Sequence, residues 1–427
     1  MIAFLPFLVV VLALLGAVHW YVWRRLVRDV TVPGGTARRL GTGLVVVLPL
    51  LSVAALVSGR AGLPFAVQQA VAWPGFLWLA LLLYVVLALL VGEAVRPLLH
   101  RVLARRDAAA PAAAPAAVAA PVPAPVPVPA PEREEEGPEP AEAPVEPASG
   151  SGVSRRLFVA RVVGGAAAAV AAGTVANGAY GVLRGPRVKR VTVPLAKLPR
   201  AAHGYRIAVV SDIHLGPILG RAHSQRIVDA INATQPDLIA VVGDLVDGTV
   251  ADLGPAAEPL AGLRARHGSF FVTGNHEYFS GADAWVDHVR ELGMRPLRNE
   301  RLEIAAGFDL AGVDDVAGER EGQGPDFGRA LGDRDRSRAA VLLAHQPVVI
   351  DDAVAHGVDL QLSGHTHGGQ LWPGNLLAEL ANPTVAGLER YGDTQLYVSR
   401  GAGAWGPPVR VGAPSDITVV QLASKQA

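Results

Sequence analysis

The sequence contains no cysteine. This absence excludes a disulfide, a thiolate zinc site and a cysteine nucleophile, so any bound metal must be held by histidine, aspartate, glutamate or asparagine. An excess of one charge is also lacking, because 38 Lys and Arg residues balance 38 Asp and Glu residues. Without a basic excess or basic clusters interleaved with aromatics, nucleic acid is not an expected partner.

The two halves of the chain differ strongly in composition. Hydrophobic residues make up 51% of the sequence, and their long uninterrupted runs lie in the first hundred residues. The second half has the mixture of residue types found in globular domains. This contrast indicates a membrane part followed by a soluble part.

Three apolar stretches, residues 2–23, 41–59 and 73–95, are long enough to cross a hydrocarbon core of about 30 Å as helices. Each is almost free of charge and apolar on every face, and tryptophans lie near the ends, as interfacial anchors do. We therefore predict three transmembrane helices within residues 1–106.

The arginines of this region indicate its orientation. They are concentrated between the first two stretches and after the third, whereas the connection between the second and third carries only Arg60. Positively charged connections stay on the cytoplasmic side, so the N-terminus is expected outside.

Residues 107–153 consist of Ala/Pro repeats followed by an acidic run. Frequent prolines keep such a chain extended, and its apolar surface is too small to offset the entropy lost on ordering. We predict a linker here. Its acidic run is expected to be a solvated spacer, and a docking segment is the alternative.

Residues 154–185 begin with the sequence SRRLFV and continue as a Gly/Ala-rich apolar stretch. The start resembles a twin-arginine export signal, and the alternative is an ordinary fourth transmembrane helix. Both interpretations leave Arg155 and Arg156 in the cytoplasm and send the following residues outward. Basic residues just after residue 183 argue against that orientation.

From about residue 190 to residue 427 the pattern is that of an α/β domain. Short β-branched runs alternate with amphipathic stretches at 221–234 and 282–292, and the later runs follow one another closely, which favours mixed sheets. The expected strands are residues 206–211, 238–242, 269–273, 339–344, 359–362, 395–399 and 417–421.

Side chains that can bind metals follow several of these strands directly. Because loops after adjacent strands share one edge of a sheet, these side chains are expected to converge in space. Imidazole, carboxylate and carboxamide groups together suit manganese, iron or zinc better than calcium. The residues are Asp212, His214, Asp244, Asn275, His276, Glu277, His345, His365 and His367.

Several other polar residues fall outside this pattern and are expected to be structural or exposed. Arg400 follows a predicted strand, where it could reach a phosphate or form an ordinary salt bridge. The residues outside the pattern are Asp247, Asp314, Asp315, His203, His223, His267, His288 and His356.

The motifs DIHLG, GDLVDG, GNHEY, AHQP and GHTHGGQ resemble those of calcineurin-like metallophosphoesterases, which include membrane-associated bacterial phosphodiesterases and transmembrane proteins with a metallophosphoesterase domain. The resemblance covers residues 203–422. It implies a four-layer αββα fold, in which two mixed sheets pack face to face between helices.

The resemblance also implies the roles of individual residues. Asp212, His214 and His367 would hold one divalent metal ion, and Asn275, His345 and His365 a second. Asp244 would bridge both ions, and His276 would be a catalytic histidine that binds neither.

The expected function is that of a membrane-anchored phosphoesterase in which a hydroxide shared by two metal ions attacks the phosphorus atom. The substrate is either water-soluble or lipid-linked, with a nucleotide-sugar diphosphate as one form of the latter. The expected location is multi-pass in the cell membrane with the catalytic domain outside. The rival function is a membrane sensor or scaffold whose metal domain does not catalyse. The sequence predicts no oligomeric state.

Overall fold

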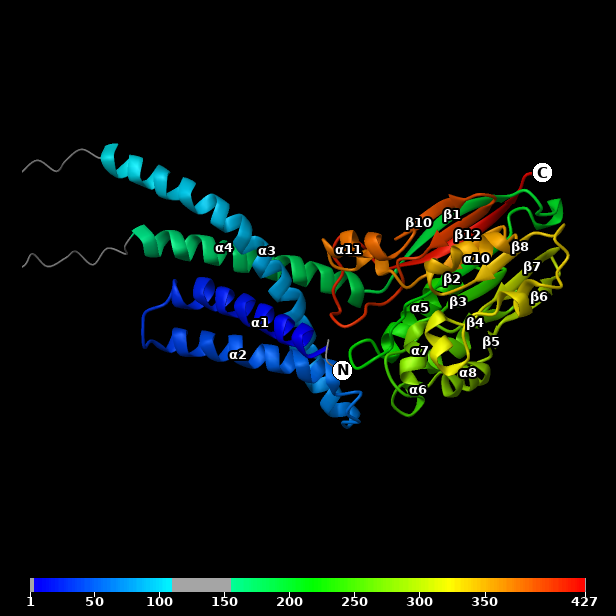
Figure 1. The fold of residues 1–427 in the computed structure, drawn as a ribbon, viewed down its shortest axis with the longest axis horizontal. Coiled ribbons are helices and arrows are strands. Elements are labelled where there is room, and N and C mark those ends of the chain that lie inside the picture. The colour runs from blue at the N-terminus through cyan, green and yellow to red at the C-terminus, as the bar shows by residue number, and fades with distance from the viewer. Residues whose placement is uncertain (1–3, 110–154, 427) are drawn as a thin grey trace, which may run out of the picture.

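The computed structural model describes residues 4–109 and 155–426. Figure 1 shows long helices on one side of the molecule and two sheets with shorter helices on the other. The long helices are α1 (Phe4–Trp23), α2 (Thr36–Val57), α3 (Phe65–Ala109) and α4 (Arg155–Leu183), with a short π-helix, η1 (Arg24–Arg28), after α1.

Within the described ranges, four helices are long and apolar enough to cross a membrane, namely α1 with η1, α2, α3 and α4. The three predicted N-terminal helices are therefore present, and α4 coincides with the predicted signal or fourth span. Helix α3 is longer than the expected span and includes residues 107–109, which were assigned to the linker. The rest of the predicted linker lies outside the described residues.

The arginine-rich ends of these helices lie together, away from the sheets. The Arg25 guanidinium donates a 2.9 Å hydrogen bond to the Glu93 carboxylate of α3, and Arg161 of α4 donates a 3.1 Å hydrogen bond to the carbonyl of Val30. Figure 1 shows the turn after α1, the end of α3 and the start of α4 on the side opposite the sheets.

Beyond α4, the described residues form two six-stranded sheets. The first has the order β1-β12-β2-β3-β4-β5 and the second the order β10-β11-β9-β8-β7-β6. Their strands are β1 (Arg187–Leu195), β2 (Arg206–Val210), β3 (Leu238–Val242), β4 (Ser269–Val272), β5 (Arg295–Pro296), β6 (Glu300–Ile304), β7 (Phe308–Gly312), β8 (Ala340–Leu343), β9 (Leu360–Ser363), β10 (Gly387–Tyr391), β11 (Thr394–Val398) and β12 (Asp416–Ser424).

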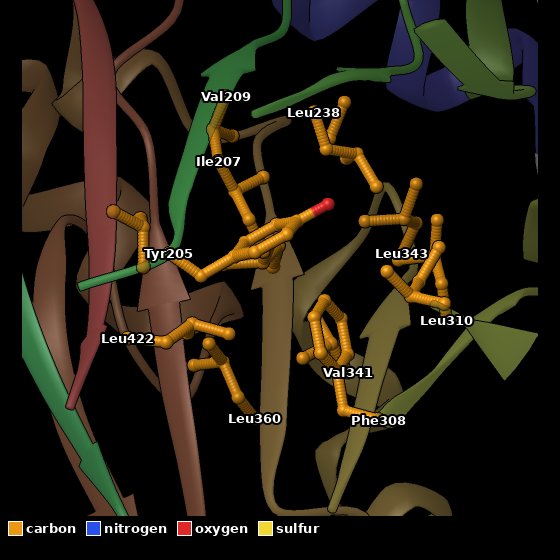
Figure 2. Packing of buried hydrophobic residues seen from close by; sticks show 14 of the residues in the cluster. Tyr205, Ile207, Val209, Leu238, Phe308, Leu310, Val341, Leu343, Leu360 and Leu422 are labelled. Carbon is orange, nitrogen blue, oxygen red and sulfur yellow. The ribbon is translucent and has the colours of Figure 1, made fainter. Parts of the chain in front are cut away.

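The two sheets pack against each other through a cluster of buried side chains, part of which Figure 2 shows. Ile207 and Leu422 from the first sheet face Leu310 and Val341 from the second, and all four are fully buried. The Tyr205 ring meets Phe308 edge on, with the ring centroids 5.0 Å apart. Burial of apolar surface from both sheets makes this layer the main core of the domain.

Shorter helices cover the outer face of each sheet. Ile227, Leu253 and Trp285 pack on the first sheet, and Phe327 and Ile350 pack on the second. The order helix, sheet, sheet, helix is the predicted four-layer αββα arrangement. The shorter helices are α5 (Arg221–Ala233), α6 (Val250–Ala257), α7 (Asn275–Ser280), α8 (Ala282–Glu291), α9 (Phe327–Leu331), α10 (Ile350–Ala355) and α11 (Gly374–Ala381), of which α11 buries no residue against a sheet.

The predicted strands match β2, β3, β4, β8, β9 and β11 closely, whereas β12 is longer than expected. The sheets are mixed, as predicted, because β12 runs parallel to β1 and antiparallel to β2. The sequence did not predict β1, β5, β6, β7 or β10. Strands β1 and β10 are edge strands with exposed charged residues, so they lack the continuous apolar pattern of the central strands.

Candidate metal centre

The candidate metal-binding side chains lie where the chain leaves neighbouring parallel strands. Strands β2, β3 and β4 run parallel in the first sheet, and β8 and β9 run parallel in the second. Asp212 and His214 follow β2, Asp244 follows β3, and Asn275 begins α7 after β4. His345 follows β8, and His365 and His367 follow β9. Both sheets thus contribute to one group of residues.

Asp212, His214 and His367 form a compact buried cluster, with one candidate ligand atom from each lying within 4.8 Å of the others. The Nε2 atoms of His214 and His367 are 3.0 Å apart. The His367 Nε2 atom is 3.4 Å from Asp212 Oδ1. This cluster is the group that the sequence analysis assigned to one ion.

Asp244, His345 and His365 form a second cluster of the same kind. The His345 Nε2 atom lies 3.1 Å from Asp244 Oδ2, and the Nδ1 atom of His365 lies 3.0 Å from the Asn275 side-chain oxygen. Asn275 therefore adjoins this cluster, as expected for a fourth donor.

Asp244 lies between the two clusters. Its Oδ2 atom is 3.1 Å from His345 Nε2 in one cluster and 3.8 Å from His214 Nε2 in the other. Its Oδ1 atom accepts a 2.9 Å hydrogen bond from the backbone amide of His276. A carboxylate in this position can contact ions at both clusters.

The backbone at these residues is held in an unusual conformation. A positive φ is uncommon outside glycine and persists only where the surrounding structure enforces it, often at functional sites. Among the predicted ligands, positive φ values between 48° and 73° occur at Asp212, His214, Asp244, His365 and His367. Gly243 has a φ of 72°, and a Cβ atom there would lie 2.6 Å from His345 Nδ1, so glycine is required at this position.

Glu277, the last residue of the GNHE motif, supports the loops instead of facing the ions. Its buried carboxylate accepts backbone hydrogen bonds from Asp244, Leu245 and Gly274, at 3.0, 2.8 and 2.6 Å. Burial and the nearby Asp244 charge raise the pKa of Glu277 to about 7. The side chain fixes the loop after β3 against the start of α7.

Asp247 was expected to be structural or exposed, but it lies inside the site. Its Oδ1 atom is 2.9 Å from Nδ1 of His214 and 2.7 Å from Nδ1 of His276. Burial alone would raise the pKa of Asp247, but the charges and hydrogen bonds of the two histidines lower it to about 2. A signal was present, because Asp247 follows Asp244 by three residues in the same strand-end turn.

His276 lies at the edge of the site and is held by Asp247. Burial would lower the pKa of His276, but the hydrogen bond and charge of Asp247 raise it to about 9. Two exposed aromatic rings, Phe279 and Trp405, meet the imidazole edge on, with centroids at 5.5 and 5.9 Å. His276 is thus held by a carboxylate, with 16% of its side chain exposed beside apolar surface.

Arg410, which the sequence analysis did not single out, contacts His367. Its buried guanidinium donates hydrogen bonds to the His367 carbonyl and to Nδ1 of the ring, both at 3.0 Å. Burial and the charges of His214 and Arg410 hold the pKa of His367 well below its usual range. A neutral imidazole is the form that binds a metal ion.

Arg400 lines a hollow beside Gly368, together with Trp372, Asn375 and Glu379. Within residues 4–109 and 155–426, no hydrogen bond or ion pair involves its side chain, so the predicted salt bridge is not found there. The phosphate contact of Arg400 stays a prediction.

The donor set fits two divalent cations. The Nε2 atom of His345 is buried and faces the Asp244 carboxylate, 3.1 Å from Oδ2. The charges of His345, His276 and His214 outweigh the effect of burial and hold the pKa of Asp244 well below its usual range, so this carboxylate is ionised. Burial and His345 lower the pKa of His365 to about 4, which keeps that ring neutral. Burial would lower the pKa of His345, but the charge of Asp244 raises it well above its usual range, so this ring would have to release a proton to take the neutral form that binds a metal ion.

The remaining histidines of the sequence analysis lie away from these clusters. His223 is buried in α5, and burial followed by the charges of Arg226 and Arg410 lowers its pKa to about 4. His267 stacks on Tyr205, and His356 stacks on Phe327. These positions agree with the structural roles expected for them.

The part of the chain that contains the site is similar to known metallophosphoesterases. The sequence profile described as calcineurin-like phosphoesterase matches residues 205–369, which include every predicted ligand. The chain is 38% identical over 298 residues to a transmembrane protein with metallophosphoesterase domain from Danio rerio, covering 66% of this chain and 65% of the relative. The chain thus spans about two thirds of that relative's length.

Two bacterial relatives match the catalytic half. A Helicobacter pylori metallophosphoesterase is 39% identical over 252 residues, covering 58% of this chain and 67% of the relative. A metallophosphoesterase of Aquifex aeolicus is 36% identical over 243 residues, covering 56% of this chain and 92% of the relative.

Proposed function

The chain belongs to the calcineurin-like phosphoesterase family, and from this premise we propose that it is a membrane-anchored two-metal phosphoesterase that hydrolyses a lipid-linked phosphoester. The metal-dependent hydrolysis of a phosphoester follows from the family. The lipid link, the roles of individual residues and the orientation in the membrane are the parts that we add.

In this proposal Asp212, His214 and His367 hold one ion, and Asn275, His345 and His365 hold the other. Asp244 contacts both, because its carboxylate faces His214 and His345. When bound, two divalent ions would activate water and neutralise charge on the phosphoryl oxygens. Asp247 orients His214 by accepting from Nδ1, as carboxylate neighbours of metal ligands commonly do, and Arg410 holds the His367 backbone by donating to its carbonyl.

His276 supplies a proton to the departing oxygen. Asp247 accepts the hydrogen bond from Nδ1, whereas Nε2 makes no hydrogen bond with the described residues. With its pKa near 9, the imidazole is protonated at neutral pH and can donate from Nε2. This pKa is that of the metal-free site, where Asp247 raises it most. Asp247 would remain beside the ring when metal ions bind.

The surroundings of His276 support a lipid-linked substrate. Trp405 and Phe279 are 55% and 62% exposed, which is unusual for large apolar side chains in a soluble domain. A Cβ atom at Gly406, next to Trp405, would lie 3.7 Å from the Phe76 ring of α3. Trp405, which meets His276 edge on, is thus followed by a residue that lies close to α3, a candidate membrane helix.

One assay tests both the activity and the substrate class. We expect the full chain, purified in detergent and loaded with Mn²⁺, to hydrolyse bis(p-nitrophenyl) phosphate. It should also hydrolyse a diphosphate-linked glycolipid presented in mixed micelles, with a lower KM than for the same headgroup without its lipid. Binding of two ions without turnover of any ester would favour a sensor or scaffold. Equal KM values for the two headgroup forms would contradict the lipid link.

We also propose that the chain crosses the membrane several times and that its catalytic domain lies outside the cytoplasm. The support is the clustering of arginine-rich helix ends opposite the sheets, together with the positive-inside rule (Figure 1). Protease added to intact spheroplasts should then remove the catalytic domain, and protection until lysis would reverse the orientation. Replacing Arg155 and Arg156 by Lys should reduce export only if the twin-arginine route is used.

A further inference from the structure

Helix α11 carries apolar side chains that its own chain leaves uncovered. Leu376, Leu377 and Leu380 are 55%, 71% and 85% exposed, and Trp372 just before the helix is 54% exposed. The spacing of the three leucines places them on one face of the helix. Such a contiguous apolar surface is rare on a soluble protein and usually marks a contact site.

The other face of α11 is polar and turns toward the catalytic half. Asn375 and Glu379 line the hollow that Gly368 and Arg400 also line, beside the His365–His367 loop. The Asn375 amide lies 3.4 Å from the Glu379 carboxylate and donates to it. Helix α11 is therefore amphipathic, with its polar face toward the site and its apolar face outward.

Helix α11 begins where the catalytic domain meets the candidate membrane helices. The Tyr84 hydroxyl of α3 donates a 3.0 Å hydrogen bond to the Trp372 carbonyl. Leu371 and Val411 pack in the same cluster as residues of α3 and α4, including Trp78 and Ala171. In Figure 1 α11 lies at the end of the bundle from which α4 enters the catalytic domain.

We propose that the apolar face of α11, formed by Trp372, Leu376, Leu377 and Leu380, is a lipid-binding surface that enters the bilayer interface beside the transmembrane helices. At 8 residues, α11 is about 12 Å long, too short to span a bilayer but suited to lie in its surface plane. Its start adjoins α3 and α4, and Trp at the edge of an apolar face is typical of the interface.

This surface has a consequence for the chemistry of the protein. The polar face of α11 and Arg400 would then lie between the lipid headgroups and the metal centre. The docked helix would thus hold the loops that carry the candidate metal ligands at the level of the lipid headgroups. The inference rests on the proposed insertion of α3 and α4, but it does not depend on which phosphoester is hydrolysed.

The absence of cysteine allows a direct test on the full chain in lipid nanodiscs. Leu377→Cys and Leu380→Cys are each labelled with a small polarity-sensitive fluorophore, and nanodiscs are prepared with or without phosphatidylcholine that carries a doxyl quencher on its acyl chain. The control is Val354→Cys, because Val354 is 37% exposed on α10, which covers the second sheet away from the helical bundle.

We expect the doxyl lipid to quench the labels at 377 and 380 several-fold more strongly than the label at 354. Quenching equal to that of the control would overturn the proposal, as would labels shielded from water but unaffected by doxyl lipid, which would indicate a protein partner or a second copy of the chain. Turnover of bis(p-nitrophenyl) phosphate by the same labelled samples is a separate readout. Lipid quenching without turnover would contradict the proposed enzyme but support the docking surface.

Discussion

The catalytic sheets bury their apolar side chains, whereas the N-terminal helices leave many of theirs exposed. Leu310 of β7 is fully buried between two sheets, whereas Leu50 of α2 is 64% exposed. Apart from α11 and the aromatic rings beside His276, the catalytic half covers its apolar surface with its own strands and helices, so water can surround it. The helical half exposes Leu and Val along its whole length and therefore requires an apolar surrounding, which a bilayer provides.

The contrast breaks down at the boundary between the halves. Phe65, at the start of α3, packs against the core of the first sheet, and Val409 of the catalytic half is buried among residues of α3 and α4. The two halves thus share side chains next to the site. Substitutions in each half can show whether the two halves act independently.

Removing a buried charge from the catalytic half should have the largest effect. We expect Asp244→Asn to reduce turnover by more than the roughly 10²–10⁴-fold typical of losing a general acid. The carboxylate faces both ligand clusters, so its loss weakens both ions and the charge that they share. Metal content by mass spectrometry and the hydrolysis rate are measured on one preparation. Asp393→Asn, at an exposed turn, is the matched control and should leave both unchanged.

A variant of Asp244 that kept both ions and near-normal turnover would disprove the bridging role. If activity is lost while the helical half stays folded, the difference between the halves is larger, because the chemistry then depends on residues of the sheets alone.

Removing His276, the proposed proton donor, should have the next largest effect. We expect His276→Ala to retain both metals but lower the hydrolysis of alkyl phosphoesters about 10²–10⁴-fold, since the leaving oxygen then lacks a proton donor. Esters of p-nitrophenol should suffer much less, because p-nitrophenolate leaves without protonation. The exposed His203→Ala serves as the control.

Two other outcomes would revise the assignment of His276. An equal fall for both kinds of ester would indicate that the ring holds the phosphate, and a lost ion would indicate that it is a ligand.

The same truncation in the two halves should give different losses of stability. Leu310→Ala is expected to destabilise the domain by about 2–5 kcal/mol, because it leaves a cavity between the sheets. Leu50→Ala should cost roughly 0.5 kcal/mol or less, since lipid replaces the missing contacts. Thermal unfolding of both variants in nanodiscs checks this. A large loss for Leu50→Ala would mean that protein, not lipid, covers that side chain.

Sequence patterns predicted the parts of the molecule that depend on local order. Central strands such as Leu238–Val242 are buried on both faces and therefore appear as continuous apolar runs, and the ligands follow them directly. Edge strand β1 alternates charged and apolar residues, which is also compatible with an exposed loop. Its pairing with β12, more than two hundred residues away, supplies the stability that no local pattern shows.

The same limit applies to the site. The clustering of the candidate ligands could be predicted because each motif is short and ends a strand. Asp247 and Arg410 matter because they contact His214, His276 and His367, which come from other strands. Contacts between segments distant in sequence leave no periodicity, so Arg410 left no signal, and Asp247 could be suspected only from its place three residues after Asp244. Helix α11 was missed because its 8 residues are too few for a clear helical period.

The smallest expected effect tests whether the halves are independent. Gly178 of α4 accepts a 3.4 Å hydrogen bond at its carbonyl from the backbone amide of Arg410, and a Cβ atom at Gly178 would lie 2.8 Å from the Arg410 carbonyl oxygen. Gly178→Ala must therefore displace the segment that holds Arg410. Because Arg410 holds the His367 carbonyl, we expect metal affinity and turnover to fall about 10-fold at most, the lower limit of the roughly 10–100-fold loss typical when a neighbour of a metal ligand is removed.

Gly181→Ala is the matched control, because it lies one turn later on the same helix and a Cβ atom there would have no atom within 4 Å. Both substitutions favour a helix equally, so helix propensity cannot explain a difference between them. Titration of Mn²⁺ against activity measures the affinity. If Gly178→Ala and Gly181→Ala bind Mn²⁺ alike, α4 serves only as an anchor. A loss confined to Gly178→Ala would show that packing of a membrane helix reaches the metal centre through Arg410.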